Sequence, residues 1–67
     1  RMDGHAIPPD FDYSKVHSLK KEAQLRLTEI RPTTLGQAAR IQGVTPAEIS
    51  LIAVMLRKAG AEEMTNE

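Results

Sequence analysis

The sequence predicts an all-α fold, in which an extended N-terminal arm is followed by a small three-helix bundle. Apolar residues recur at spacings of three and four within 19–30 and 45–58, which is the helical period. Two stretches begin with a hydroxyl residue followed three positions later by Glu or Gln, a helix start signal. No segment shows the two-residue alternation of a strand. We therefore divide the chain into an arm and linker (1–18), a three-helix domain (19–60) and a frayed tail (61–67).

The arm is expected to be extended because it contains Pro8-Pro9. Consecutive prolines favour polyproline-like backbone, and the residue before each proline avoids the helical region. The apolar anchors of the arm are Ile7, Phe11 and Tyr13. We expect these three side chains to pack on the helices.

The first helix is expected from about Leu19 to Ile30. Ser18 is the available N-cap, because its hydroxyl can accept from an amide of the first turn. Arg31-Pro32 ends the helix, since proline disfavours helical backbone at the residue before it. Helical spacing places these residues on the inward face: Leu19, Ala23, Leu27 and Ile30.

The second helix is short, from about Leu35 to Ile41, and begins with a capping box formed by Thr34 and Gln37. Gly43 supplies the positive φ of the turn that follows. The residues expected to face inward are Leu35, Ala38 and Ala39.

The third helix, over 45–58, is the central one. Thr45 and Glu48 form a second capping box, and Pro46 occupies the first helical position, where its missing N–H costs nothing. Gly60 can end the helix in a left-handed conformation. Basic residues then occupy the last turn, where they suit the helix dipole: Arg57 and Lys58.

Two sides of this central helix are apolar. The inner face carries Ile49, Ile52, Ala53 and Leu56, and a second stripe carries Leu51, Val54 and Met55. A helix that is apolar on both sides must be covered on both. Either the arm or another protein covers the second stripe, and we expect its Met55 end to stay exposed and to bind a partner.

The formal net charge is zero, but the charges are unevenly distributed. Residues 14–58 hold eight basic and three acidic side chains, whereas the two ends hold one basic and six acidic. This basic middle indicates a polyanion partner, with an ordinary solvated surface as the alternative. Arg31 and Arg40, near the junction of the helices, can bind phosphate through their guanidinium forks. Alternatively, one caps helix carbonyls and the other is a surface charge.

Residues 35–52 also fit a helix-turn-helix. A DNA-reading helix presents Arg, Lys, Asn or Gln near its N-terminus. Here those positions hold Ala47, Glu48, Ser50 and Leu51. A DNA-binding regulator domain is therefore an alternative that lacks its readout chemistry, and a purely structural protein-interaction domain is a second alternative.

No catalytic, cofactor-binding or metal site is expected in this chain. It contains no cysteine, which excludes thiolate metal sites and fits a reducing compartment. His5 and His17 lie twelve positions apart without the further ligands that a metal needs, so we interpret both as solvated surface. Asp10 and Asp12 form a polar edge beside Phe11. No nucleophile stands with a positioned base.

The longest apolar run is far shorter than the roughly 20 residues that span a bilayer, so no membrane association is expected. The N-terminus lacks the apolar core of a signal peptide. Because the chain begins with Arg and not Met, we expect a fragment or a processed product.

Three segments carry a family resemblance. They read Ile-Pro-Pro-Asp-Phe-Asp-Tyr over 7–13, Arg-Pro-Thr-Thr-Leu-Gly-Gln-Ala-Ala-Arg-Ile over 31–41 and Gly-Val-Thr-Pro-Ala over 43–47. In this order they resemble the C-terminal helical domain of the MnmG (GidA) family, over about residues 7–58. Three motifs in register are far more specific than any one of them.

The resemblance implies membership of an FAD-dependent tRNA-modifying enzyme that works with the GTPase MnmE. The two proteins install the aminomethyl or carboxymethylaminomethyl group on the wobble uridine, using FAD, NADH, a methylene-tetrahydrofolate and glycine or ammonium. The family forms a cytoplasmic homodimer, and its C-terminal domain is implicated in contacting tRNA and MnmE. FAD and NADH are thus implied for the full-length enzyme, and none is expected in this fragment.

Carried onto this sequence, the resemblance implies a non-catalytic tRNA- and partner-binding module. Its RNA-binding candidates are Arg31, Arg40, Lys20, Lys21, Arg57 and Lys58. Its partner-binding candidates, facing MnmE or the rest of the enzyme, are Leu51, Val54 and Met55. The chain departs from the family at Ser18-Leu19-Lys20, where Gly-Leu-Ser is usual, and at Ala39, where Ser is frequent. The FAD-binding domain and the catalytic cysteines lie outside this chain.

Overall fold

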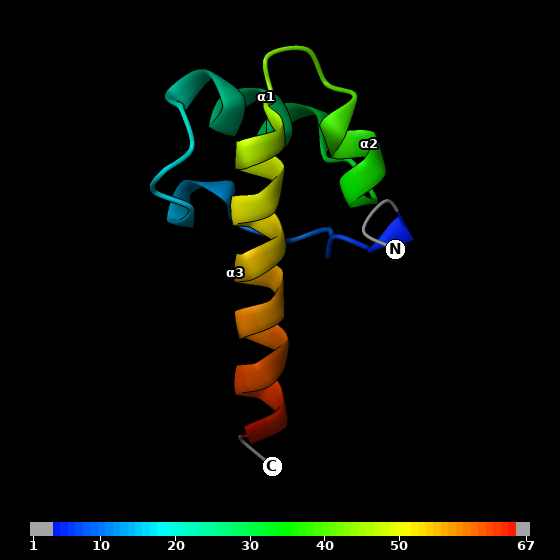
Figure 1. Ribbon diagram of the computed structural model, residues 1–67, viewed down its shortest axis with the longest axis vertical. Helices are drawn as coiled ribbons and strands as arrows, with labels where there is room; N and C mark the ends of the chain where they lie inside the picture. The colour runs from blue at the N-terminus through cyan, green and yellow to red at the C-terminus, as the bar shows by residue number, and fades with distance from the viewer. Residues whose placement is uncertain (1–3, 66–67) are drawn as a thin grey trace.

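The computed structural model describes residues 4–65, and the side chains of residues 4–59. After the arm come a short 3-10 helix, η2, and three α-helices: η2 Tyr13–Lys15, α1 Lys21–Ile30, α2 Leu35–Ala39 and α3 Pro46–Thr65. The arm, α1 and α2 gather around the N-terminal half of α3, whose later turns extend beyond them (Figure 1). No strand forms within residues 4–65, where a single bridge joins Ala6 to Thr34. The predicted all-α class is confirmed.

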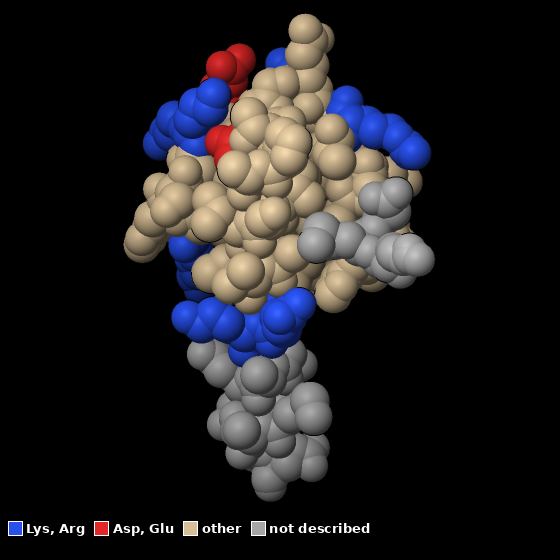
Figure 2. Space-filling model, viewed as in Figure 1, with Lys and Arg blue, Asp and Glu red and all other residues tan. Residues whose placement is uncertain are grey.

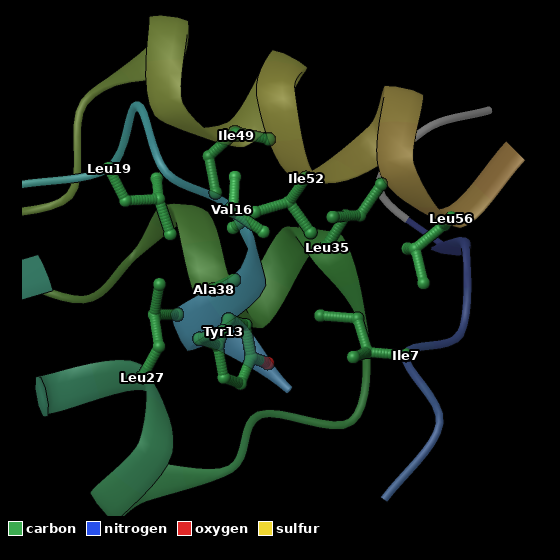
Figure 3. Packing of buried hydrophobic residues seen from close by; sticks show 10 residues of the cluster. All are labelled: Ile7, Tyr13, Val16, Leu19, Leu27, Leu35, Ala38, Ile49, Ile52 and Leu56. Atoms are coloured by element: carbon green, nitrogen blue, oxygen red, sulfur yellow. The ribbon is translucent and has the colours of Figure 1, made fainter. Parts of the chain in front are cut away.

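One buried hydrophobic cluster joins the arm to all three helices (Figure 3). Ile52 lies fully buried in it, as its place on the inner face of α3 predicts. The arm contributes Ile7 and Tyr13, so two of the three expected anchors are buried, and Phe11 packs partly buried against the cluster. The members are Ile7, Tyr13, Val16, Leu19, Leu27, Leu35, Ala38, Ile49, Ile52 and Leu56.

The start of α1 differs from the prediction. Its N-cap is Lys20, whose side chain makes no capping hydrogen bond, so Ser18 is not the cap. Leu19 is buried just ahead of the helix. Ile30, expected inside, is 51% exposed, because it belongs to the last turn and α1 packs chiefly through residues nearer its start. The predicted stop is confirmed: the Arg31 N–H donates to the Leu27 carbonyl from a left-handed conformation.

Helix α2 is shorter than predicted and ends at Ala39, with Arg40 as its C-cap. Thr34 Oγ1 accepts from the Gln37 N–H as expected, but Gln37 Oε1 accepts from the Thr33 N–H, one residue earlier than a reciprocal box. Ala39 is exposed and not inward-facing, since a five-residue helix buries only one narrow face, through Leu35 and Ala38.

Gly43 adopts the predicted positive φ, +97°, in the turn between α2 and α3. Side chains rarely tolerate this conformation, so glycine is required here for conformational reasons. The turn connects α2 to α3, and the two helices contact each other.

Helix α3 runs past Gly60 to Thr65, so the predicted end at Gly60 is wrong. A glycine inside a helix costs only about 1 kcal/mol relative to alanine, and the residues after it are good helix formers. The tail expected at 61–67 is therefore helical as far as Thr65, and residues 66–67 lie outside the described residues. Arg57 and Lys58 accordingly lie within the helix and not in its last turn.

Glu48 is the one buried charged side chain among residues 4–59, at 5% exposure. Its Oε1 accepts from the Thr45 N–H at 2.9 Å and the Thr45 hydroxyl at 3.2 Å, which confirms the predicted capping box. Its Oε2 accepts from the Lys20 N–H at 3.1 Å. One carboxylate therefore joins the start of α3 to the start of α1, and the Thr45 amide is the main cause of its lowered pKa.

Replacement of Ile52 by alanine tests the assignment of the core. We expect Ile52→Ala to lower the free energy of unfolding by about 2–5 kcal/mol, because it leaves a cavity at a fully buried position. Calorimetry should show a thermal midpoint lowered by many degrees, given roughly 4–8 °C per kcal/mol in a domain of this size. The matched control is Val54→Ala on the exposed side of α3. Equal midpoints for the two variants would contradict the assignment.

Glu48→Gln should lower the free energy of unfolding at pH 7 by about 1–3 kcal/mol, because the amide's NH₂ would face one of the backbone donors. The effect should also depend on pH. Since the folded-state pKa of Glu48 is lowered, its contribution is complete above the ordinary glutamate pKa of about 4.3 and is lost as pH falls through the lowered value.

Urea unfolding at pH 7 and at pH 3 would measure this difference, with Glu29→Gln on the exposed surface of α1 as the control. The gap between wild type and Glu48→Gln should narrow at pH 3. A gap of constant size at both pH values would show that the carboxylate charge does not stabilise the fold.

Candidate functional site

The predicted RNA-binding side chains are all exposed, but they do not form one cluster. Lys20 and Lys21 lie at the start of α1, which the Glu48 hydrogen bond places beside the start of α3. Arg57 and Lys58 lie nine or more residues further along α3, about 14 Å by the helical rise. Figure 2 shows the face of the molecule that carries α3, with basic side chains at its margins around an uncharged centre. A polyanion that contacts all of them must span the length of the domain.

Two arginines flank the turn between α2 and α3. Arg40 is the C-cap of α2 and precedes the turn. Arg26, on α1, has its Cδ 3.9 Å from the position that a Cβ on Gly43 would occupy. Sequence reasoning missed Arg26, because only the packing of α1 against the turn brings it there. This corner therefore offers two exposed guanidinium-bearing side chains, from α1 and α2.

Arg31 makes contacts that the sequence did not reveal. Its Nη1 donates to the Phe11 carbonyl and, at 3.3 Å, to the Pro9 carbonyl. Its guanidinium carbon lies 5.5 Å from the centre of the Tyr13 ring, within the range of a cation–π contact. Its backbone N–H caps α1, whereas its side chain holds the arm. Carbonyl acceptors carry no residue signature, so no sequence pattern indicates this arrangement.

The apolar stripe on α3 is divided in the structure. Leu51 and Met55 are half-buried and pack against the core, whereas Val54 is 53% exposed. The exposed end expected at Met55 is therefore found at Val54. Its neighbours toward the helix start are small and exposed, Ala47 and Ser50. The face of α3 shown in Figure 2 bears no Lys, Arg, Asp or Glu at its centre.

The remaining polar candidates have structural surroundings. Asp12 accepts from the backbone N–H and the hydroxyl of Ser14, at 3.0 and 2.6 Å, and these bonds lower its pKa. The carboxylate thus caps η2. Burial raises the pKa of Tyr13, whose hydroxyl has no hydrogen-bond partner within the described part of the chain. His5 and His17 are both exposed.

The described residues form neither a metal-binding group nor a membrane-spanning helix. Within them, no three side chains among His, Cys, Asp and Glu come together as a metal-binding group. No helix in the same part of the chain has the length and apolar character needed to cross a membrane.

Comparisons with known proteins agree with the all-α fold and identify the family. The model of the tRNA modifying enzyme MnmG/GidA C-terminal helical bundle matches residues 1–67. A protein of Roseiflexus castenholzii, called tRNA uridine 5-carboxymethylaminomethyl modification enzyme MnmG, is 42% identical over 64 residues, which are 96% of this chain and 10% of that protein. The protein of the same name from Treponema denticola is 48% identical over 56 residues, 84% of this chain and 9% of that protein.

Solved structures show the same relationship. Aquifex aeolicus GidA, in two crystal forms, superposes with a TM-score of 0.77 at 47% identity, over 82% of this chain and 9% of that protein. The chain thus spans about a tenth of the length of the relatives that it matches. With the family model covering every residue, the chain belongs to the MnmG/GidA family, as its C-terminal helical bundle.

Proposed function

We propose that this chain is the C-terminal tRNA- and partner-binding module of a tRNA wobble-uridine modification enzyme, and that it is not catalytic by itself. The relatives carry the name of a tRNA modification enzyme, of which this chain matches a tenth. FAD and NADH chemistry, the homodimer contact and the catalytic cysteines then belong to the remaining nine-tenths. The enzyme works in the cytoplasm, where its tRNA substrate is found.

The exposed basic middle of the chain is the observation that carries the RNA role. Residues 14–58 have five more basic than acidic side chains, and every one of the basic side chains is exposed. All of them except Arg31, whose guanidinium contacts the arm, therefore remain available to phosphate groups. We propose that these side chains contact the tRNA backbone: Lys20, Lys21, Arg40, Arg57 and Lys58.

The structure favours RNA over duplex DNA as the polyanion. The start of α3 would have to enter a major groove, yet it presents Ala47 and Ser50 there. Glu48 is withdrawn into two capping interactions and cannot read a base. Basic residues spread around the domain suit recognition of an RNA surface by its shape and phosphates.

Val54 is the centre of the proposed partner contact. Val54 is an exposed β-branched side chain beside the uncharged Ala47 and Ser50, with Arg57 and Lys58 one turn further along α3. An apolar patch with a charged rim is suited to packing against another protein. We propose that this face contacts the GTPase MnmE, with the half-buried Leu51 and Met55 supplying its edges.

Loss of single cations tests the RNA role in the full-length enzyme. Lys20→Ala, Arg40→Ala and Lys58→Ala should each weaken binding of all tRNAs about equally and reduce the salt slope by about one. Binding would be measured at two salt concentrations, with Arg40→Lys as the control that keeps the charge. If all three alanine variants kept wild-type affinity and slope, these residues would lie outside the RNA surface.

A charge placed on α3 tests the partner role. Val54→Lys should leave folding intact, because the position is exposed, and should weaken the complex with MnmE by burying a charge at the interface. Calorimetric titration of the two full-length proteins measures the effect, with Thr28→Lys on the exposed surface of α1 as the control. A complex of unchanged affinity would remove this face from the MnmE interface.

A further inference from the structure

The N-terminal arm, residues 4–13, is attached to the helical body at two places. At the first, the Ile7 N–H donates to the Thr33 carbonyl and the Leu35 N–H donates to the His5 carbonyl, each at 2.9 Å. These bonds form the single β-bridge of the described chain. At the second place, the carbonyls of residues 9 and 11 meet the Arg31 side chain. The segment that receives the arm therefore lies within residues 31–35.

We infer that Arg31 is a positioning residue that fastens the arm, and that its guanidinium serves this contact and not an RNA phosphate. The inference departs from the sequence-based prediction for Arg31. It concerns the fold of the domain and does not require the proposed RNA role to be correct.

The backbone of Arg31 directs its side chain toward the arm. Its φ is +54°, and it is the one residue other than glycine with a positive φ in the described chain. A residue with a Cβ adopts this left-handed conformation at an energetic cost, so local preference does not explain arginine here. Glycine or asparagine is the usual residue at this position of a helix end. The side-chain contacts of Arg31 offset this cost.

An arginine suits this position because of its shape. One NH₂ group carries two hydrogens, and both acceptor carbonyls lie within its reach. The carbonyls converge because the arm turns there, with the Phe11 N–H donating to the Pro8 carbonyl. The flat guanidinium also lies over the Tyr13 ring. A lysine ammonium has neither the planar fork nor the same stacking surface.

Tyr13 connects this contact to the core. Its ring is buried, and it meets the Phe11 ring edge-on with the centroids 5.0 Å apart. Arg31 thus contacts the carbonyl of one aromatic residue and the face of the next. Ile7, at the bridge, is buried in the same cluster (Figure 3). Loss of the Arg31 contacts would loosen the stretch between Ile7 and Tyr13, the two buried residues of the arm. The core residues that this stretch covers would then be exposed.

Hydrogen exchange of single amides in the 67-residue chain tests the inference. The variants are Arg31→Lys, which keeps the charge, and Arg31→Gly, which tolerates the left-handed backbone but has no side chain to donate. Both should raise exchange of the Ile7, Phe11 and Leu35 amides by about tenfold, the typical effect of losing hydrogen bonds to a charged group. The Gln24 and Ile49 amides, whose hydrogen bonds lie at the starts of α1 and α3, should change much less.

The matched control is Arg40→Lys, an exposed arginine that also follows a helix. All amides of this variant should exchange at the wild-type rate. The inference would be overturned by wild-type exchange at Ile7 and Leu35 in both Arg31 variants, or by an equal rise at every amide.

Titration of tRNA with the full-length Arg31→Gly enzyme, which lacks the charge, tests whether Arg31 contacts an RNA phosphate. Reduced affinity and a lower salt slope, with arm exchange unchanged, would make Arg31 an RNA contact and refute the positioning role. Faster exchange in the arm with an unchanged salt slope supports it, whether or not the other basic residues bind RNA.

Discussion

The fold depends on one buried carboxylate that two helices share. A carboxylate without partners would be strongly unfavourable at the depth of Glu48, yet its two oxygens accept from the Thr45 amide and hydroxyl and from the Lys20 amide. It also lies in the first turn of α3, where the helix dipole favours a negative charge. These bonds join the start of α1 to the start of α3, and Leu27 of α1 lies in the same buried cluster as Ile52 of α3. A domain of 67 residues, with little core to spare, gains much from such a fixed junction.

The same residue shows how far sequence reasoning can go. The bond from Thr45 to Glu48 spans three positions, so the local pattern predicts it. The bond from Lys20 spans 28 positions and has no local signature. The errors have the same origin. Ile30 has the right helical spacing but is left exposed, because periodicity identifies a face and cannot say how far the neighbouring elements extend over it. Gly60 is a permitted helix end that the chain does not use.

The same limit applies to the candidate site, where features set by residue type could be predicted and contacts between distant positions could not. Exposure of the cations was predictable from their type, since charged side chains are rarely buried without a partner. The roles of Arg31 and Arg26 were not, because one contacts backbone carbonyls and the other lies beside a glycine turn. The partners of Arg31 are backbone carbonyls, which every residue has, and the partner of Arg26 is a glycine, which has no side chain. Neither contact leaves a pattern in the sequence. Val54 replaces Met55 as the exposed member of the apolar stripe because rotation about α3 is set by its inner face.

The side chains that stabilise the fold are therefore largely separate from those of the proposed RNA surface. The core consists of apolar residues, the capping groups include Asp12, Thr34 and Glu48, and Arg31 holds the arm. The other basic side chains take no part in these contacts. Surface charges of this kind usually contribute little to folding, so their substitution is expected to leave the domain folded. Arg31 is the exception, a surface cation whose hydrogen bonds belong to the fold. An effect of Arg31 on RNA binding would consequently report first on the arm, and only a salt slope can separate the two causes.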